Sequence, residues 1–236
     1  ESLRPGQGLV LERRSTSPLQ PPEEVGGRVM VVERLGRERL RLKLGPGRLN
    51  LRDLTDTFRT SASKLSYFLV VEATKHLTTS EVEINTPLTK TAGVQIENNS
   101  VAISVLRAGL GLMDGVQQLI PNISFGYIGV QRNEETAEPE NYYEKLPDLV
   151  NKNVFILEPM LATGGSLSFA METVKKYNPK NIHALTVISA PEGIEKIKEN
   201  HPDITLITAS IDEKLDENWY IVPGLGDMGD RLFGTT

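Results

Sequence analysis

The sequence lacks several features that would assign it to a particular class of protein. It contains no cysteine, which excludes a disulfide framework and thiolate chemistry. No apolar stretch approaches the roughly 20 residues of a membrane-spanning helix. The first residues also lack the basic start and apolar core of a signal peptide. We therefore expect a cytoplasmic protein that has no membrane partner.

An excess of positive charge and a metal-ligand spacing are also missing. The formal net charge is −5, so no global electrostatic attraction favours nucleic acid as a partner. The three histidines, His76, His183 and His201, are scattered and have no metal-ligand spacing. We expect them to be ordinary surface or packing residues. Any anionic ligand must then be bound by local geometry.

The 236 residues suffice for one domain with a full hydrophobic core. We predict an irregular N-terminal arm over residues 1–50 and the folded domain over residues 51–236. The arm is rich in arginine, and prolines and glycines interrupt it repeatedly. A solvated tail explains this composition better than a site for RNA or lipid.

The domain alternates between the helical and the strand periodicity. Helices are expected over residues 54–76, 110–119, 166–177 and 191–199, and strands over 81–84, 101–106, 125–130, 154–157, 182–188 and 204–208, with a hairpin extension at 141–146. This alternation predicts an α/β fold with a doubly wound, mostly parallel sheet flanked by helices. Ligands of such sheets bind beyond the carboxyl ends of the strands, at the topological switch point.

The most informative segment runs from Val154 to Ser166. Four apolar residues predict a buried strand, Glu158 follows it, and a Gly164-Gly165 turn leads to Ser166, the expected N-cap of a helix. Backbone N–H groups at such a turn can surround a phosphate, because glycine has no Cβ to block the approach. Glu158 would repel phosphate and is therefore expected to hold sugar hydroxyls or Mg²⁺. A tight structural turn explains the two glycines alone equally well.

Two arginines also follow predicted strands. Arg107 lies in the segment Val-Leu-Arg-Ala-Gly, and Arg132 opens a polar stretch that reaches Glu140. A guanidinium group donates two parallel hydrogen bonds to phosphate oxygens, so both residues suit a diphosphate. We expect the polar stretch to be a mobile flap. Pairing of Arg107 with a nearby acid, and an ordinary charged hairpin tip at Arg132, are the alternatives.

A glycine-rich segment lies near the carboxyl end. Its glycines, Gly224, Gly226 and Gly229, match the dinucleotide-binding fingerprint, but too few residues follow them for a second half of a βαβ unit. A Pro223-Gly224 turn and the bare backbone at Gly226 instead suit main-chain recognition of a flat heterocycle. Asp227 and Asp230 are candidates for hydroxyl or Mg²⁺–diphosphate contacts. A purely structural turn is the alternative.

Together and in this order, these motifs resemble the uracil phosphoribosyltransferase family, from about Phe58 to Thr235. Further family-like segments are Glu72-Ala-Thr, Tyr143-Glu-Lys-Leu-Pro, Ala190-Pro-Glu-Gly, Ala209-Ser-Ile-Asp and Arg231-Leu-Phe-Gly. The resemblance implies a type I phosphoribosyltransferase fold. The implied reaction converts phosphoribosyl diphosphate (PRPP) and uracil into UMP and diphosphate, as in pyrimidine salvage.

The resemblance also implies site residues, a cofactor and partners. Catalytic roles fall to Arg107, Arg132 and Asp227, and uracil binding to Tyr220, Ile221 and Gly226. Mg²⁺ would arrive with PRPP, with Asp227 as its one candidate protein contact, and a homodimer or homotetramer with a GTP effector is expected. The implied PRPP-binding residues are Arg107, Arg132, Glu158, Met160, Leu161, Ala162, Thr163, Gly164, Gly165, Ser166 and Asp227.

The chain departs from the family pattern at two site positions. Glu158 stands where the family has Asp, and Ser104 stands where it usually has Pro. Residues 1–50 also differ from the usual start of the family, which helps to form the oligomer interface. Two alternatives therefore stay open: a catalytically silent homologue that binds PRPP or another nucleotide for regulation, and a transferase for another base.

Overall fold

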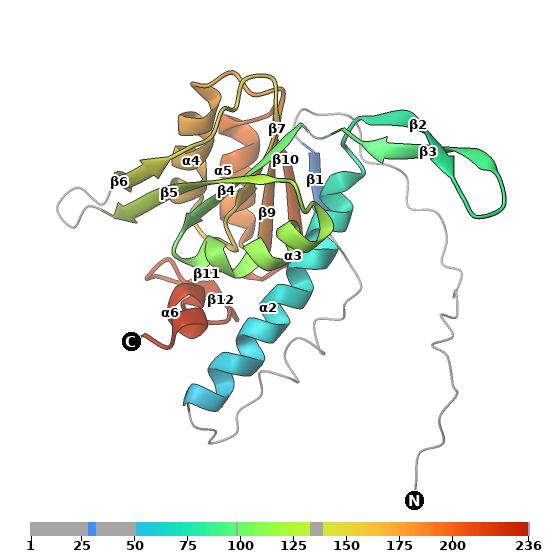
Figure 1. Ribbon diagram of the computed structural model, residues 1–236. Helices are drawn as coiled ribbons and strands as arrows, with labels where there is room; N and C mark the ends of the chain where they lie inside the picture. The colour runs from blue at the N-terminus through green and yellow to red at the C-terminus, as the bar shows by residue number, and fades with distance from the viewer. Residues whose placement is uncertain (1–27, 32–50, 98, 133–138, 236) are drawn as a thin grey trace, which may run out of the picture.

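The computed structural model describes residues 28–31, 51–97, 99–132 and 139–235. Its centre is a mostly parallel sheet in the order β1-β10-β9-β7-β4-β5-β6, with the short strand β8 paired to β9 (Figure 1). Only β6 runs antiparallel to its neighbour within this sheet. The strands are β1 Arg28–Val31, β4 Ser100–Leu106, β5 Ser124–Arg132, β6 Pro139–Lys145, β7 Asn153–Leu157, β8 Met160–Leu161, β9 Asn181–Ser189 and β10 Thr205–Ile211.

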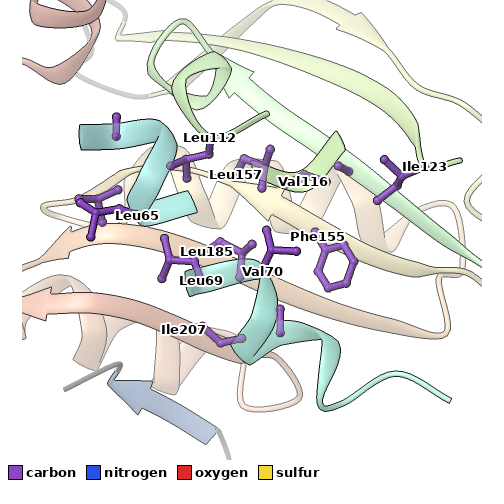
Figure 2. Close-up of a cluster of buried hydrophobic side chains, with 14 of the residues drawn as sticks. Leu65, Leu69, Val70, Leu112, Val116, Ile123, Phe155, Leu157, Leu185 and Ile207 are labelled. Atoms are coloured by element: carbon purple, nitrogen blue, oxygen red, sulfur yellow. The ribbon is translucent and has the colours of Figure 1, made fainter. Parts of the chain in front are cut away.

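Helices cover both faces of this sheet, as the alternating sequence pattern predicted. On one face, α2 (Leu51–Thr74) and α3 (Met113–Leu119) pack over buried residues of β7 and β9 such as Phe155 and Leu185 (Figure 2). On the other, α4 (Gly165–Lys175) and α5 (Pro191–Asn200) pack over Ile156 and Ala184. The central strands are therefore mostly apolar and almost entirely buried, because neither side of them meets water.

The helix α2 shows how the periodic pattern becomes core packing. Apolar residues recur every three or four positions, so they fall on one face of the helix and are removed from water. The buried apolar residues of α2 are Phe58, Ala62, Leu65, Leu69, Val70 and Ala73, and Leu77 is buried just beyond the end of the helix. The long apolar stripe fixes α2 across the sheet, where its first half also reaches the C-terminal segment.

Two strands of the chain form a separate hairpin. Strand β2 (Thr79–Asn85) was predicted at 81–84, and it pairs antiparallel with β3 (Lys90–Ile96), which the sequence pattern did not reveal. Figure 1 shows the hairpin projecting away from the central sheet. Neither strand of the hairpin has a buried face. The residues of β3 therefore show no alternation of buried and exposed positions that a sequence pattern could reveal.

The other differences from the predicted elements are local. Within the segment expected to be irregular, Arg28–Val31 form the edge strand β1 beside β10, while the rest of residues 1–50 lies outside the described part. The helix predicted at 110–119 begins earlier, as a 3₁₀ turn over Ala108–Leu112. Three small elements complete the carboxyl end: β11 Lys214–Leu215, β12 Ile221–Val222 and α6 Met228–Phe233. Among the described residues, no helix is long and apolar enough to span a bilayer.

Candidate active site

The order of the strands locates a switch point between β4 and β7. From β4 the chain continues to β5 and β6 on one side, and later to β7, β9 and β10 on the other. A crevice opens at such a reversal, beyond the carboxyl ends of the strands. Arg107 follows β4 directly and Glu158 follows β7 directly, so these two predicted site residues flank the switch point.

The loop that follows Glu158 leads into α4 and forms the predicted phosphate cradle. Gly164 has a φ of +79°, a left-handed conformation that glycine adopts without strain. Its carbonyl already accepts the N–H of Ser168 at 2.9 Å, so α4 begins at Gly165. The expectation that Ser166 is the N-cap is therefore wrong: Gly164 is the cap and Ser166 lies inside the first turn. The left-handed conformation of Gly164 lets α4 begin two residues earlier than an N-cap at Ser166 would allow.

The cradle can bind an anion through its backbone. The first N–H groups of α4 have no partner within the helix, and the helix dipole makes this end electropositive. Thr163 and Ser166 are exposed beside these groups, so their hydroxyls are accessible to a ligand. Met160 and Leu161 form β8, whose pairing with β9 fixes the entry to the loop.

The start of α5 packs directly beneath the cradle. A Cβ added to Gly193 would lie 2.2 Å from the carbonyl oxygen of Ala162, which no side chain tolerates. A Cβ at Gly164 would in turn lie 3.4 Å from the carbonyl oxygen of Gly193. The Ala190-Pro-Glu-Gly segment is therefore the support on which residues 162–164 rest.

Glu158 lies at the switch point but is turned out of water. Its side chain is only 9% exposed, and its Oε2 atom has no hydrogen-bond partner among the described residues. Burial raises the pKa of this carboxyl group to about 8, so the protonated form predominates at neutral pH. Glu158 is thus a buried carboxyl group rather than a free anion at the mouth of the switch point.

Arg107 is held at its tip by the C-terminal segment. The Nη2 atom lies 2.9 Å from Oδ1 of Asp230, and Nη1 donates to Oγ1 of Thr235 at 3.2 Å. The hydrogen bonds from Thr235 and Arg107 hold the pKa of Asp230 below its ordinary value. Arg107 does pair with an acid, as the alternative reading of its motif allowed. Its side chain is nevertheless half exposed at the edge of the switch point.

The predicted flap is described only in part. Strands β5 and β6 form the expected hairpin, and β5 ends at Arg132, opposite Pro139. The side chain of Arg132 and residues 133–138 lie outside the described residues. β5 continues three residues past its last pairing with β4, Leu106 with Gly129, so Arg132 lies beyond the carboxyl end of β4.

The predicted base-binding residues lie in or next to residues 221–227, here called the base loop. This segment comprises β12 and the turn that leads to α6. Ile221 is buried and pairs with Leu215, whereas Tyr220 just before it is 65% exposed. The Val222–Pro223 peptide bond is cis. Gly224 has a φ of +63°, and a Cβ there would lie 2.0 Å from the carbonyl oxygen of Ile221. The turn therefore requires glycine at this position.

The base loop is fastened at several points. The N–H of Gly224 donates to Oδ2 of Asp212 at 2.8 Å, and Nη1 of Arg231 donates to the carbonyl oxygen of Leu225 at 2.7 Å. The guanidinium group of Arg231 also lies 4.2 Å above the ring of Phe58 on α2, a cation–π contact. Asp227 caps α6 by accepting the N–H of Asp230 at 2.8 Å.

Sequence reasoning assigned no role to several of these residues. Asp212 directly follows β10, so it could have been found by the same rule as Arg107 and Glu158, which looks for polar residues at the carboxyl ends of strands. The pairing of Arg107 with Asp230 could not be found in this way, because the two residues are separated by 123 positions. Ser104 is fully buried beneath the Arg107 turn, and its Oγ has no partner among the described residues.

The arrangement offers anion binding rather than metal binding by side chains alone. Among residues 28–31, 51–97, 99–132 and 139–235 there is no group of three or more His, Asp or Glu side chains that could hold a metal ion. A helix start, a half-exposed arginine and a backbone-rich loop surround one edge of the sheet. Such a site suits a phosphorylated sugar and a small heterocycle.

Comparison with known proteins agrees with this chemistry. The model of the family described as uracil phosphoribosyltransferase matches residues 48–235. The uracil phosphoribosyltransferase of Malacoplasma penetrans is 51% identical over 179 residues, which are 75% of this chain and 87% of that protein. The one of Wolinella succinogenes is 49% identical over 191 residues, 79% of this chain and 92% of that protein. The solved structure of the AQ2163 protein from Aquifex aeolicus is 35% identical, with a TM-score of 0.77 over 88% of this chain and 99% of that one. The chain therefore belongs to the uracil phosphoribosyltransferase family.

Proposed function

We propose that this chain transfers the phosphoribosyl group of PRPP to uracil, giving UMP and diphosphate. The observation that carries the proposal is the meeting of three parts at one switch point: the cradle before α4, Arg107 after β4, and the base loop tied to Arg107 through Asp230. Each part suits one portion of the two substrates. Membership in the family supports the same reaction.

The 5′-phosphate belongs in the cradle formed by Thr163, Gly164, Gly165 and Ser166. The first N–H groups of α4 point at this position and the helix dipole favours negative charge there. Met160, Leu161 and Ala162 lead the backbone into the cradle and contribute shape rather than charge. Glycine at 164 lets the phosphate approach the main chain closely.

The diphosphate belongs beside Arg107, with Arg132 of the β5–β6 hairpin as the second cation. As the bond between the anomeric carbon and the diphosphate oxygen breaks, negative charge grows on the leaving group and positive charge on the sugar. The bond to the uracil ring nitrogen forms at the same carbon, and the proton of that nitrogen passes to the departing diphosphate or to water. Arg107 stabilises the departing charge, which is where a fixed donor accelerates a reaction most.

Magnesium fits this site as a companion of the diphosphate. Asp227 and Asp230 bring carboxylate oxygens to the base loop, yet Oδ1 of Asp230 already accepts from Arg107 and Thr235. The described chain thus has no preformed cage, and Mg²⁺ would be held chiefly by phosphate oxygens, with Asp227 as the nearest protein candidate. When bound, the ion neutralises charge on the diphosphate.

Uracil belongs against the base loop. Main-chain groups of Ile221 and Gly226 can read the polar edge of a flat ring, and Gly226 has a φ of +77°. Tyr220 supplies an exposed aromatic ring at the entrance. The hydrogen bonds from Gly224 to Asp212 and from Arg231 to Leu225 keep the loop in shape before uracil binds.

Glu158 is the proposed contact of the ribose hydroxyls. Within the described part of the chain its Oε2 is buried without a hydrogen-bond partner, and a sugar hydroxyl would supply one. A protonated carboxyl group can donate one hydrogen bond and accept others, which matches a diol. The burial of Glu158 is also the one observation that favours the second candidate function, a homologue that binds PRPP without turnover.

We also propose a homo-oligomer and a GTP effector, as the family resemblance implies. The β2–β3 hairpin supports the first of these, because Ile84, Leu88 and Val94 are exposed on it and a two-stranded hairpin gains stability from a partner. Light scattering of the wild type and of Leu88→Asp tests the interface, since the added charge should lower the oligomer mass. The rate of UMP formation with and without GTP tests the effector.

The decisive experiment measures UMP formed from PRPP and uracil, with and without Mg²⁺. We expect UMP to form with Mg²⁺ and much more slowly once a chelator has removed it. A panel of competing bases separates uracil from a transferase for another base. PRPP binding by calorimetry without any UMP would instead establish the silent homologue.

A further inference from the structure

Asp230 joins two parts of the site that are far apart in the sequence. Its backbone N–H donates to Oδ1 of Asp227 at 2.8 Å, which ties it to the base loop. Its carboxylate Oδ1 lies 2.9 Å from Nη2 of Arg107 and accepts the hydroxyl of Thr235 at 2.6 Å. One residue thus contacts both the base loop and the arginine that follows β4.

The contacts of Arg107 fix the direction of its guanidinium group. Nη2 points to Asp230 and Nη1 donates to Thr235 at 3.2 Å, so both ends of the planar fork are held. A guanidinium group has five N–H donors in a rigid plane. Because each of these contacts occupies one of them, donors remain for a diphosphate. The pair therefore orients Arg107 without saturating it.

The carboxylate of Asp230 does little for the stability of the fold. The side chains of Arg107 and Asp230 are 52% and 36% exposed, and exposed ion pairs contribute little to folding. The cap of α6 uses the backbone N–H of Asp230, which any substitution except proline retains. Loss of the carboxylate should therefore leave α6 and the base loop folded.

We propose that Asp230 is a positioning residue that aims Arg107 at the diphosphate of PRPP. Through it, correct placement of the leaving-group arginine depends on an ordered C-terminal segment. The two substrate sites are thereby coupled, because the segment that carries the base loop also orients the arginine. This inference rests on the proposed function, since it assigns the diphosphate to Arg107.

A double-mutant cycle tests whether Asp230 acts through Arg107. UMP formation and PRPP binding by calorimetry are measured for the wild type, Asp230→Ala, Arg107→Ala and the double variant. Asp230→Asn is the conservative variant, since its Oδ1 can still accept from the guanidinium group without the charge. Asp203→Asn is the matched control. Asp203 also forms an ion pair, with Nζ of Lys175 at 2.7 Å from its Oδ1, but this pair is not part of the base loop.

We expect Asp230→Ala to lower kcat/KM for PRPP by about 10-fold when Arg107 is present, since a small misplacement of a charge-stabilising group lowers the rate steeply. In the Arg107→Ala background the same change should have less than about 2-fold effect, because contacts within one network are not additive. Asp230→Asn should recover part of the loss, and Asp203→Asn should match the wild type. Equal losses in both backgrounds, with unchanged thermal unfolding, would overturn the proposal.

The two readouts separate this proposal from the proposed function. If the wild type forms UMP and the cycle is additive, only the role of Asp230 is wrong. If the wild type binds PRPP but forms no UMP, the proposed reaction is wrong. The role of Asp230 is then tested by the PRPP dissociation constants of the four proteins in the cycle. A wild type that does not bind PRPP contradicts both proposals.

Discussion

The imidazole Nε2 atom of His201 lies 2.8 Å from the hydroxyl oxygen of Ser168. This contact joins the end of α5 to the first turns of α4, the helix that begins at the phosphate cradle. The other ring nitrogen, Nδ1, lies 3.4 Å from Nζ of Lys175, which forms an ion pair with Asp203. The first turn of α5 thus supports the cradle through Gly193. The residue that ends α5, His201, contacts α4 through Ser168.

Replacing Ser168 with Ala should destabilise the protein by roughly 1–3 kcal/mol, because His201 would keep a buried ring nitrogen without a partner. Urea unfolding at neutral pH measures the change. Ser166→Ala, on an exposed position of the same helix, is the matched control for stability alone. Equal unfolding midpoints for the wild type and Ser168→Ala would show that the hydrogen bond contributes nothing to the fold.

The buried His183 should make the protein sensitive to acid. Burial, and then the proximity of His76, lower the pKa of His183 from its ordinary value to about 4. The unfolded chain therefore takes up a proton between about pH 6.5 and pH 4 that the folded chain does not. The contribution of His183 to the free energy of unfolding should therefore fall over this window as the pH decreases, by roughly 3 kcal/mol in total.

Substitution of His183 by Phe tests this assignment. His183 packs between the rings of His76 and Phe155, with centroid distances of 5.7 and 5.6 Å, so a phenyl ring can occupy the same space. The free energy of unfolding of the variant, relative to that of the wild type, should rise as the pH falls from 6.5 to 4, because only the wild type loses the contribution of His183. An unchanged slope in urea unfolding across this range would assign the acid sensitivity to other groups.

Glu158 should produce the opposite dependence at higher pH. Its pKa is raised to about 8 in the folded protein, so the folded chain keeps a proton that the unfolded chain releases above about pH 4.5. The contribution of Glu158 to stability should therefore fall as the pH rises from 4.5 to 8, and it opposes the contribution of His183 where the two windows overlap. Glu158→Gln, which mimics the protonated form, should remove this part of the decline in urea unfolding.

Kinetics of the same position test its proposed role at the ribose. Glu158→Asp restores the family residue, and Glu158→Ala removes the ribose contact. We expect Glu158→Ala to raise the KM for PRPP by about 10-fold, since one hydrogen bond to the substrate is lost. If Glu158→Ala still forms UMP with an unchanged KM for PRPP, Glu158 does not contact the ribose.

Gly193→Ala should disturb the cradle without touching substrate. The new Cβ would lie 2.2 Å from the carbonyl oxygen of Ala162, so residues 162–164 must shift. We expect the KM for PRPP to rise by about 10-fold or more, and the KM for uracil to change little, because displacement by a fraction of an ångström weakens phosphate contacts. Lys196→Ala, an exposed position on α5, should match the wild type.

Much of the fold could be predicted because burial dictates the sequence pattern. The strands β4 and β7 are mostly apolar and are buried on both faces of the sheet, and α2 carries an apolar residue every three or four positions. Strand β3 could not be found, since its residues meet solvent and follow no burial pattern. The two-residue strand β8 was hidden because pairing with β9, rather than composition, defines it.

The site was predictable where a residue directly follows a strand, as Arg107 and Glu158 do. What sequence could not supply were the contacts between distant segments. The Arg107–Asp230 pair and the support of Ala162 by Gly193 depend on tertiary packing. The burial of Glu158, and with it the raised pKa, is likewise a property of the folded surroundings rather than of the residue type.

The most direct test of the account is the rate of UMP formation by the wild type and by Arg107→Ala, at saturating PRPP, uracil and Mg²⁺. We predict that the wild type forms UMP and that the variant is slower by about 10²–10³-fold, the usual cost of removing one charge-stabilising donor. Thermal unfolding of the two proteins should be similar, because Arg107 is half exposed. UMP formation by Arg107→Ala at nearly the wild-type rate, or a wild type that forms no UMP, would contradict the account.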